Sequence, residues 1–533
     1  MHRLYAILLC AVSSGASAAT AYAPFTFANS ATGQSQGLWL ADSAHPGNPP
    51  VQVSNQTLDG TTANIATFND WTLDANRHAT DIQPQLVVYG VGGHLFKVNL
   101  SPLTAVQQLG NGTYQELCSL TPLDQHPFAP GRAFVQAVVE PVGSPNTCAQ
   151  NLGTQTWLIP ANATAAAAPT LRPSFWSVLG AFTDPATGAF NKWIIWTGNE
   201  IDTDNATFTR ASTLLVGPPA GPAPVLTFRL DGTAFIDSQV TAGTTVTDNW
   251  YRLTPATAAL IASFPYANTA PCAFFSTSML DAATGTFVIV APDNLGYAAF
   301  TTPIGGGALT QIYSDHSGTV CGAIEGDSAS AGFISLGESD VNTGLTTAIG
   351  INEAGPATQT KVVLAGGPNS SAFVHYTIGG HDWIDLSTFG PGGTTFSTIV
   401  ADADGTLVQT YANSRISDDG WSGFPVSGAP SNIDRDVVYL FSPASTVNCT
   451  GGTLAAINPS TFVSTNIAGL PANACRPLAF GFGPINLGGL ATATGGGSPI
   501  QIDPTAGQLY FPLGPQPGGS FLNPAILSGY PFF

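Results

Sequence analysis

The stretch LDAATGTFVIVAPDNLGYAAFT, residues 280–301, contains two runs rich in Val, Ile, Phe and Tyr, each preceded by a turn. In the first turn Asp281 stands four residues before Gly285. An Asp side chain can accept hydrogen bonds from backbone N–H groups of its own turn, and Gly supplies the positive φ that closes a hairpin. The stretch therefore predicts a pair of antiparallel strands joined by a tight turn.

The same turn recurs along the chain. Three further copies keep the spacing and one copy is a residue shorter: TDPATGAF (183–190), SDVNTGLT (339–346), IDPTAGQLYF (502–511) and ADADGTLV (401–408). Further strands are predicted at runs such as ALTQIY (308–313) and KVVLAG (361–366). From Asp184 to Asp503 these signals fit a unit of roughly 50–60 residues.

No sustained helical periodicity follows the N-terminal twenty residues, so the chain is expected to be all-β. Four-stranded units at a fixed period indicate a β-propeller before a sandwich. We expect a single propeller of seven or eight four-stranded blades over residues 19–515, stabilised by disulfides, with one blade split between the termini. The length allows seven to nine units, and the alternative is two smaller β domains divided near residues 230–270.

These turns resemble those of secreted bacterial β-propellers in general, which implies the fold and nothing finer. The repeat signatures of the WD, kelch and YWTD families are missing from the sequence. The segment SDDGW, from Ser417 to Trp421, is one residue short of the S-x-D-x-G box of sialidases, which is a structural turn.

The two ends of the chain have their own patterns. MHRLYAILLCAVSSGASAAT combines a basic residue, a short apolar run and the small-residue motif ending at Ala18, which predicts a signal peptide over residues 1–18. We therefore expect a secreted or periplasmic protein. Residues 516–533 are rich in Gly and Pro and are predicted to be a tail. No other stretch approaches the ~18 apolar residues of a membrane span, so none is expected in the mature chain.

The amino-acid composition limits the classes of partner that the protein is expected to bind. The net charge is −19 and the only lysines are Lys97, Lys192 and Lys361, which argues against binding nucleic acid. Amides and hydroxyls suit a neutral glycan, a polymer or a protein ligand, and we expect a monomer. Beyond the signal peptide lie six cysteines, an even number that predicts three disulfides in an exported chain. The pairing expected among fifteen is sequential: Cys118–Cys148, Cys272–Cys321 and Cys449–Cys475.

The segment HYTIGGHDWID, residues 375–385, contains several histidine and aspartate residues in a chain that has few histidines and few charged residues. His375 lies in a predicted strand, and His381 and Asp382 follow a Gly-Gly turn. Two imidazoles and a carboxylate can bind a divalent metal ion or act as acid and base. No cofactor is predicted, although this pattern would suit such an ion. The competing interpretation is a solvated polar hairpin.

A second group of candidates surrounds this segment in sequence. Arg415, Asp418, Asp419 and Trp421 combine charges with an indole, a set that suits a sugar ring. His316 is a candidate ligand-binding residue on a loop between blades. The structural alternatives are rim salt bridges, a packed Trp and a solvated His.

Two functions remain open from the sequence. The first is a binding or scaffold module that recognises a glycan, polymer or protein through its loops, with His316, His375 and Trp421 as ligand-binding residues. The alternative is an extracellular polysaccharide hydrolase or lyase whose site gathers at the mouth of the central channel. Its catalytic candidates are His381, Asp382, Arg415, Asp418 and Asp419.

Overall fold

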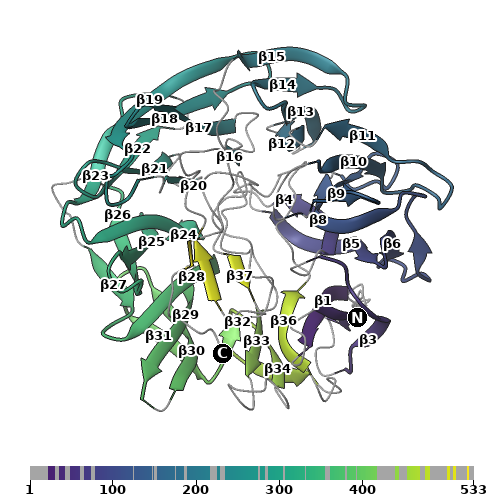
Figure 1. Ribbon diagram of the computed structural model, residues 1–533. Coiled ribbons are helices and arrows are strands. Elements are labelled where there is room, and N and C mark those ends of the chain that lie inside the picture. The colour runs from purple at the N-terminus through teal and green to yellow at the C-terminus, as the bar shows by residue number, and fades with distance from the viewer. Residues whose placement is uncertain are drawn as a thin grey trace, which may run out of the picture.

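The computed structural model describes residues 22–29, 35–42, 48–60, 65–73, 79–123, 125, 127–146, 148, 153–173, 176–184, 189–216, 225–228, 234–273, 276–281, 286–303, 306–330, 332–354, 361–378, 381–391, 393–416, 438–442, 453–467, 474–480, 501–503, 508–511 and 525–526. Within these ranges every named element is a β-strand. Nine four-stranded antiparallel sheets lie around a centre (Figure 1), and the chain is a β-propeller.

Each sheet begins with an innermost strand and continues outwards from the centre (Figure 1). From inside to outside, the first sheet consists of β36 (Ala474–Phe480), β1 (Tyr22–Asn29), β2 (Ser35–Asp42) and β3 (Val51–Thr57). The second consists of β4 (Ile65–Leu73), β5 (Ala79–Val91), β6 (His94–Asn99) and β7 (Gln107–Gln108). The third consists of β8 (Tyr114–Leu123), β9 (Phe134–Pro141), β10 (Gln155–Pro160) and β11 (Thr170–Pro173).

The next three sheets have the same meander. They are β12 (Ser177–Thr183), β13 (Phe190–Trp196), β14 (Glu200–Asp204) and β15 (Arg210–Val216); β16 (Val225–Phe228), β17 (Ala234–Ala242), β18 (Thr245–Leu253) and β19 (Ala258–Ala267); and β20 (Thr277–Asp281), β21 (Thr286–Pro292), β22 (Tyr297–Pro303) and β23 (Thr310–Asp315).

The last three sheets complete the ring. They are β24 (Val320–Ser330), β25 (Phe333–Asp340), β26 (Thr346–Asn352) and β27 (Val362–Ala365); β28 (Ser370–Ile378), β29 (His381–Gly390), β30 (Gly393–Asp402) and β31 (Leu407–Ala412); and β32 (Arg415–Ile416), β33 (Val438–Ser442), β34 (Thr453–Ile457) and β35 (Ser464–Ile467). A separate three-stranded sheet contains β37 (Gln501–Asp503), β38 (Gln508–Phe511) and β39 (Ala525–Ile526).

The two ends of the propeller meet in its first sheet. Strand β36 pairs antiparallel with β1, and Phe25 lies opposite Phe480. The expected blade split between the termini is therefore confirmed. The described residues form nine four-stranded sheets, one more than the upper expected count of eight and at the top of the range that the length allowed. The reason is that the stretch from Tyr22 to Phe480 uses only roughly 50 residues per sheet.

The core lies between neighbouring sheets. Phe235 and Trp250 of the fifth sheet pack against Phe287 of the sixth, with ring centroids 4.0 Å and 5.8 Å apart. Similar apolar clusters join most neighbouring pairs around the ring. Because a middle strand is covered by a sheet on each side, β21 is buried at six successive positions instead of alternating. The outermost strand β15 has an exposed face.

The repeated Asp-to-Gly turn closes hairpins as predicted. Asp340 accepts the backbone N–H groups of Asn342 and Thr343 at 2.9 Å and 2.8 Å, and Gly344 has a φ of 70°. The copies nevertheless close different hairpins, namely β12–β13, β20–β21, β25–β26, β30–β31 and β37–β38. The motif is thus a general hairpin turn and does not mark one position in the blade.

Two of the three expected disulfides are confirmed, Cys118–Cys148 and Cys272–Cys321. Cys449 and the side chain of Cys475 lie outside the described residues, so their pairing stays a prediction. In the part of the chain that the structure describes, no helix has the length and apolar character to cross a membrane.

Candidate functional site

The meander topology assigns each hairpin to one of two faces of the ring. We call the end where the chain enters each innermost strand the leading face, and the other end the trailing face. Because the strands are antiparallel, the second hairpin of each sheet also closes at the leading face. The first and third hairpins close at the trailing face.

His381 lies at the trailing face and is held by one carboxylate. It begins β29 after the first hairpin of its sheet, and its Nδ1 lies 2.7 Å from Oδ1 of Asp402, at the end of β30. Its ring also lies 5.6 Å from that of Phe462, in the following sheet. The pair is half-buried.

Asp382 lies on the other face of the same sheet. Its side chain is 1% exposed, and its Oδ2 accepts a hydrogen bond of 3.0 Å from the hydroxyl of Ser335 in the preceding sheet. Successive residues of a strand project to opposite faces, which separates this carboxylate from the His381 imidazole. The structure therefore does not bring His381 and Asp382 together as one acid–base pair.

The remaining candidates are also dispersed. His316 follows β23 at the leading face, where its Nε2 lies 2.7 Å from Oδ2 of Asp293, in the second hairpin of that sheet. Arg415 begins β32 at the leading face, opposite Phe441. His316 and Arg415 thus lie at the face away from His381.

Several candidates lie outside what the structure describes. These are Asp418, Asp419, Trp421 and the side chains of His375 and Arg415. The backbone of His375 lies in β28 at a shift in register between Val374 and Tyr376. Within the described ranges, no group of three or more His, Cys, Asp and Glu side chains is placed to hold a metal ion.

The contacts of Asp382 and His381 predict that truncation of Asp382 destabilises the protein more than truncation of His381. The Asp382→Ala variant is expected to lose about 2–3 kcal/mol of unfolding free energy, because it leaves the buried Ser335 hydroxyl without this acceptor. The His381→Ala variant is expected to lose no more than about 1 kcal/mol, since its contact with Asp402 is half-exposed. Urea denaturation followed by fluorescence measures both, and the reverse order would contradict the structural role assigned to Asp382.

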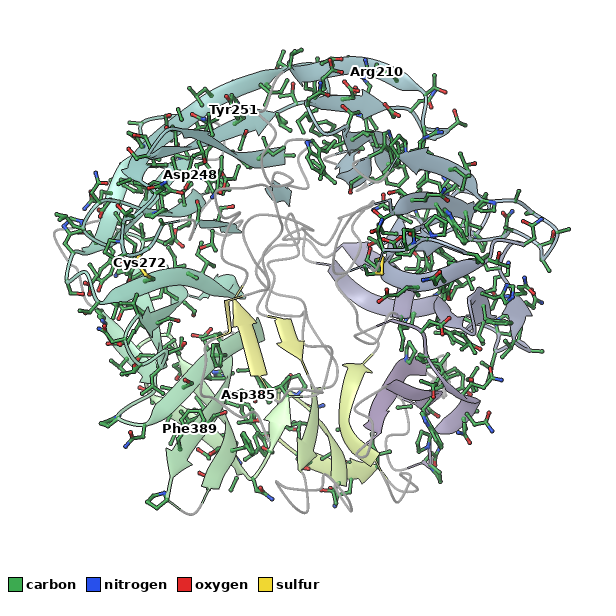
Figure 2. The ribbon with its side chains drawn as sticks, in the orientation of Figure 1. Arg210, Asp248, Tyr251, Cys272, Asp385 and Phe389 are labelled. Carbon is green, nitrogen blue, oxygen red and sulfur yellow. A yellow bond between two sulfur atoms is a disulfide. The ribbon has the colours of Figure 1, made fainter. Side chains whose placement is uncertain are left out.

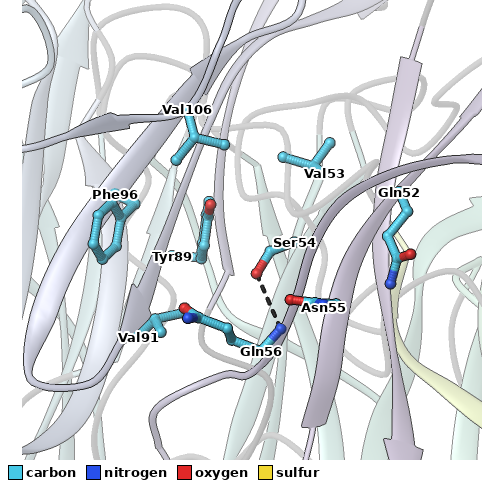
Figure 3. A pocket seen from close by; sticks show the side chains of 9 residues that line it. All are labelled: Gln52, Val53, Ser54, Asn55, Gln56, Tyr89, Val91, Phe96 and Val106. Atoms are coloured by element: carbon cyan, nitrogen blue, oxygen red, sulfur yellow. Dashed lines mark hydrogen bonds between the residues drawn. The ribbon is translucent and has the colours of Figure 1, made fainter.

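A pocket that the sequence did not reveal lies between the first and second sheets (Figure 3). Its volume is about 360 Å³. One wall is the outermost strand β3, and the other comes from β5, β6 and the residue before β7. The lining residues are Gln52, Val53, Ser54, Asn55, Gln56, Tyr89, Val91, Phe96 and Val106.

The wall formed by β3 supplies polar, uncharged groups. Gln52, Asn55 and Gln56 are exposed, and the Ser54 hydroxyl accepts the backbone N–H of Gln56 at 3.2 Å. The opposite wall supplies two stacked rings, Tyr89 and Phe96, whose centroids lie 6.0 Å apart. Among the lining side chains only Tyr89 can ionise, and burial raises its pKa to about 12, so the pocket is neutral at ordinary pH.

The hairpin behind the rings is fixed by contacts between blades. Asp59, just beyond β3, accepts the backbone N–H groups of Gly92 and Gly93 at 3.0 Å and 2.8 Å. Both glycines have left-handed φ values, 59° and 82°, which the two-residue turn between β5 and β6 requires. The Tyr114 hydroxyl of the third sheet donates to Asp59 at 2.7 Å. The pocket is therefore pre-formed by three successive sheets.

The comparisons with known proteins find structural similarity only at low sequence identity. Neither a protein-family profile nor a curated protein matches the chain. A closed oligopeptidase B from Trypanosoma brucei with bound antipain aligns at 10% identity and a TM-score of 0.36, over 64% of this chain and 47% of that chain. This chain thus spans less than half the length of that peptidase.

Two further solved structures are similar at the same level. Prolyl oligopeptidase B from Galerina marginata aligns at 7% identity and a TM-score of 0.39, over 77% of this chain and 52% of that one. TolB from Acinetobacter baumannii aligns at 11% identity and a TM-score of 0.27, over 62% and 79%. These similarities concern the fold alone, and the activities named belong to those proteins.

Proposed function

We propose that the protein is an exported binding module and that the pocket between β3 and the β5–β6 hairpin receives a neutral glycan segment. The observation that carries the proposal is the pairing of an amide-rich wall with two aromatic rings in a cavity without charge. Amides of Gln52, Asn55 and Gln56 can donate to and accept from sugar hydroxyls. The Phe96 ring offers an apolar surface for the C–H face of a sugar.

The export predicted from the sequence supports this assignment. The signal peptide predicted over residues 1–18 and the two disulfides both suit an oxidising compartment outside the cytosol. Polysaccharides and glycoconjugates are accessible there. The site differs from the loop-mediated recognition that the sequence suggested, because it is a groove between two blades.

The polysaccharide hydrolase or lyase is less well supported. That alternative needs His381, Asp382 and Arg415 around one substrate. Asp382 instead contacts Ser335 on the opposite side of its strand from His381, and Arg415 begins its strand at the leading face.

The pocket is tested by removing two amides at once. The Asn55→Ala/Gln56→Ala variant is expected to bind neutral oligosaccharides at least ~10-fold more weakly, because two hydrogen bonds of about 1 kcal/mol each are lost. Calorimetric titration of the mature chain with soluble oligomers of glucose, xylose and mannose measures the affinity. Asn55 also begins an Asn-Gln-Thr sequon, so protein made without N-glycosylation is used.

A matched control separates the pocket from the general surface. Thr310 and Gln311 lie exposed on β23, another outermost strand. The Thr310→Ala/Gln311→Ala variant should bind like the wild type, and both variants should keep its melting temperature. Equal affinity of the two double variants, or no saturable binding of any neutral oligosaccharide by the wild type, would refute the proposal.

A further inference from the structure

Between the fifth and sixth sheets lies a cluster of buried side-chain oxygen atoms that lack hydrogen-bond partners in the described structure. In the β17–β18 ladder Asp237 is opposite Trp250, and Gln239 is opposite Asp248. Residues opposite each other in an antiparallel pair project to the same face. Trp250 packs on Phe287 of the sixth sheet, so the two carboxylates and the amide face that sheet too.

The three side chains are almost fully covered. Asp237, Gln239 and Asp248 are 3%, 7% and 0% exposed. Oδ1 of Asp237, Oδ2 of Asp248 and both amide atoms of Gln239 are buried without a hydrogen-bond partner in the described structure. A buried carboxyl group must be paired, bound to a cation or neutralised by a proton. No Lys, Arg or His of the described residues forms an ion pair with either one.

The other oxygen of Asp248 is already oriented. The Tyr266 hydroxyl donates to Oδ1 at 3.1 Å, which leaves Oδ2 for another partner. Burial raises the pKa of Asp248 to about 7, although the hydrogen bond from Tyr266 opposes the shift. Burial and the charge of Asp248 raise the pKa of Asp237 as well. The strand register thus places two mutually repelling acids on one face of the sheet, and each has one oxygen without a hydrogen-bond partner in the described structure.

We propose that Asp237, Gln239 and Asp248 form a binding site for a hard divalent cation, with calcium as the ion of matching chemistry. Two carboxylates and an amide carbonyl are oxygen ligands of the kind that calcium takes, and water completes its shell. The dipositive charge balances both acids. Tyr266 then acts as a positioning residue that orients Asp248.

The three side chains lie toward one end of their strands. Gln239 lies three residues before the end of β17, and Asp248 lies three residues after the start of β18. The site is therefore close to the β17–β18 hairpin and to the leading face. Figure 2 shows Asp248 within this part of the ring, beside the sheet that follows it. A cation here would join two blades, independently of the proposed glycan pocket.

Calcium addition to chelator-treated protein tests the site. At pH 7.5 the wild type is expected to retain one calcium per chain after gel filtration, measured by mass spectrometry. Its melting temperature should rise by about 3 °C when free calcium is ~100-fold above the dissociation constant. The Asp248→Asn variant should lose both effects. Asp340→Asn, which removes an acid from a surface turn, should keep both.

A milder variant covers the case in which Asp248→Asn does not fold. Gln239→Met keeps the side-chain length and both carboxylates but removes the amide oxygen, so calcium affinity should fall at least ~10-fold. The same calcium response in Asp248→Asn or Gln239→Met and in the wild type would reveal binding elsewhere on the acidic surface, and would overturn the proposal.

The proposal also fails if calcium neither binds nor changes the melting temperature while Asp248→Asn matches or exceeds the wild type at pH 7.5. The pair would then share a proton. Because the folded pKa of Asp248 is raised to about 7, its contribution to stability would decline as the pH rises from about 4 through about 7.

Discussion

The Trp193→Ala variant is expected to lose about 3–5 kcal/mol of unfolding free energy, as large aromatic truncations in cores do. Trp193 is fully buried between the third and fourth sheets. Its ring stacks on Phe208 at a centroid distance of 5.3 Å and lies 4.8 Å from Phe190. Removing the indole opens a cavity where two blades meet. Urea denaturation followed by circular dichroism measures the change.

A conservative variant makes this test specific. The indole N–H of Trp193 is buried without a hydrogen-bond partner in the described structure, so Phe at this position loses volume but no hydrogen bond. Trp193→Phe is expected to lose less than about 1.5 kcal/mol. Val216→Ala, at a position 73% exposed, should stay within about 0.5 kcal/mol of the wild type. Equal losses for the alanine and phenylalanine variants at position 193 would contradict this packing.

Opening the Cys272–Cys321 disulfide should have an effect of similar size. The bridge spans 49 positions and joins the loop before the sixth sheet to the start of the seventh. Chain-entropy arguments give about 4 kcal/mol for a loop of this length. The Cys272→Ala/Cys321→Ala variant is therefore expected to unfold at a much lower urea concentration. Figure 2 marks Cys272 among the buried side chains of this region.

The shorter bridge provides the comparison. Cys118–Cys148 spans 30 positions, for which the same argument gives about 3.6 kcal/mol. Its double alanine variant should be slightly less destabilised, and reduction of the wild type should lower stability more than either variant. A loss below about 1 kcal/mol at the longer bridge would show that the segment between Cys272 and Cys321 is already restricted when the chain is unfolded.

The sequence by itself determined the local features. Asp340 and Gly344 form the turn that their identities predict, because its hydrogen bonds join residues two and three positions apart. Two of the three sequential disulfides, the strand-rich repeats and the blade shared by the termini are also confirmed, since each follows from short spacing or from the need to close a ring.

Only the tertiary structure decided which residues of neighbouring blades lie close together. Whether a residue lies at the leading or trailing face depends on its strand's place in the meander, so the backbones of His381 and Arg415 lie at opposite faces although the two residues are near in sequence. The side-chain direction along a strand separates His381 from Asp382. The pocket beside Tyr89 and the oxygens around Asp248 arise where neighbouring sheets pack, and such packing brings together residues that no local pattern relates.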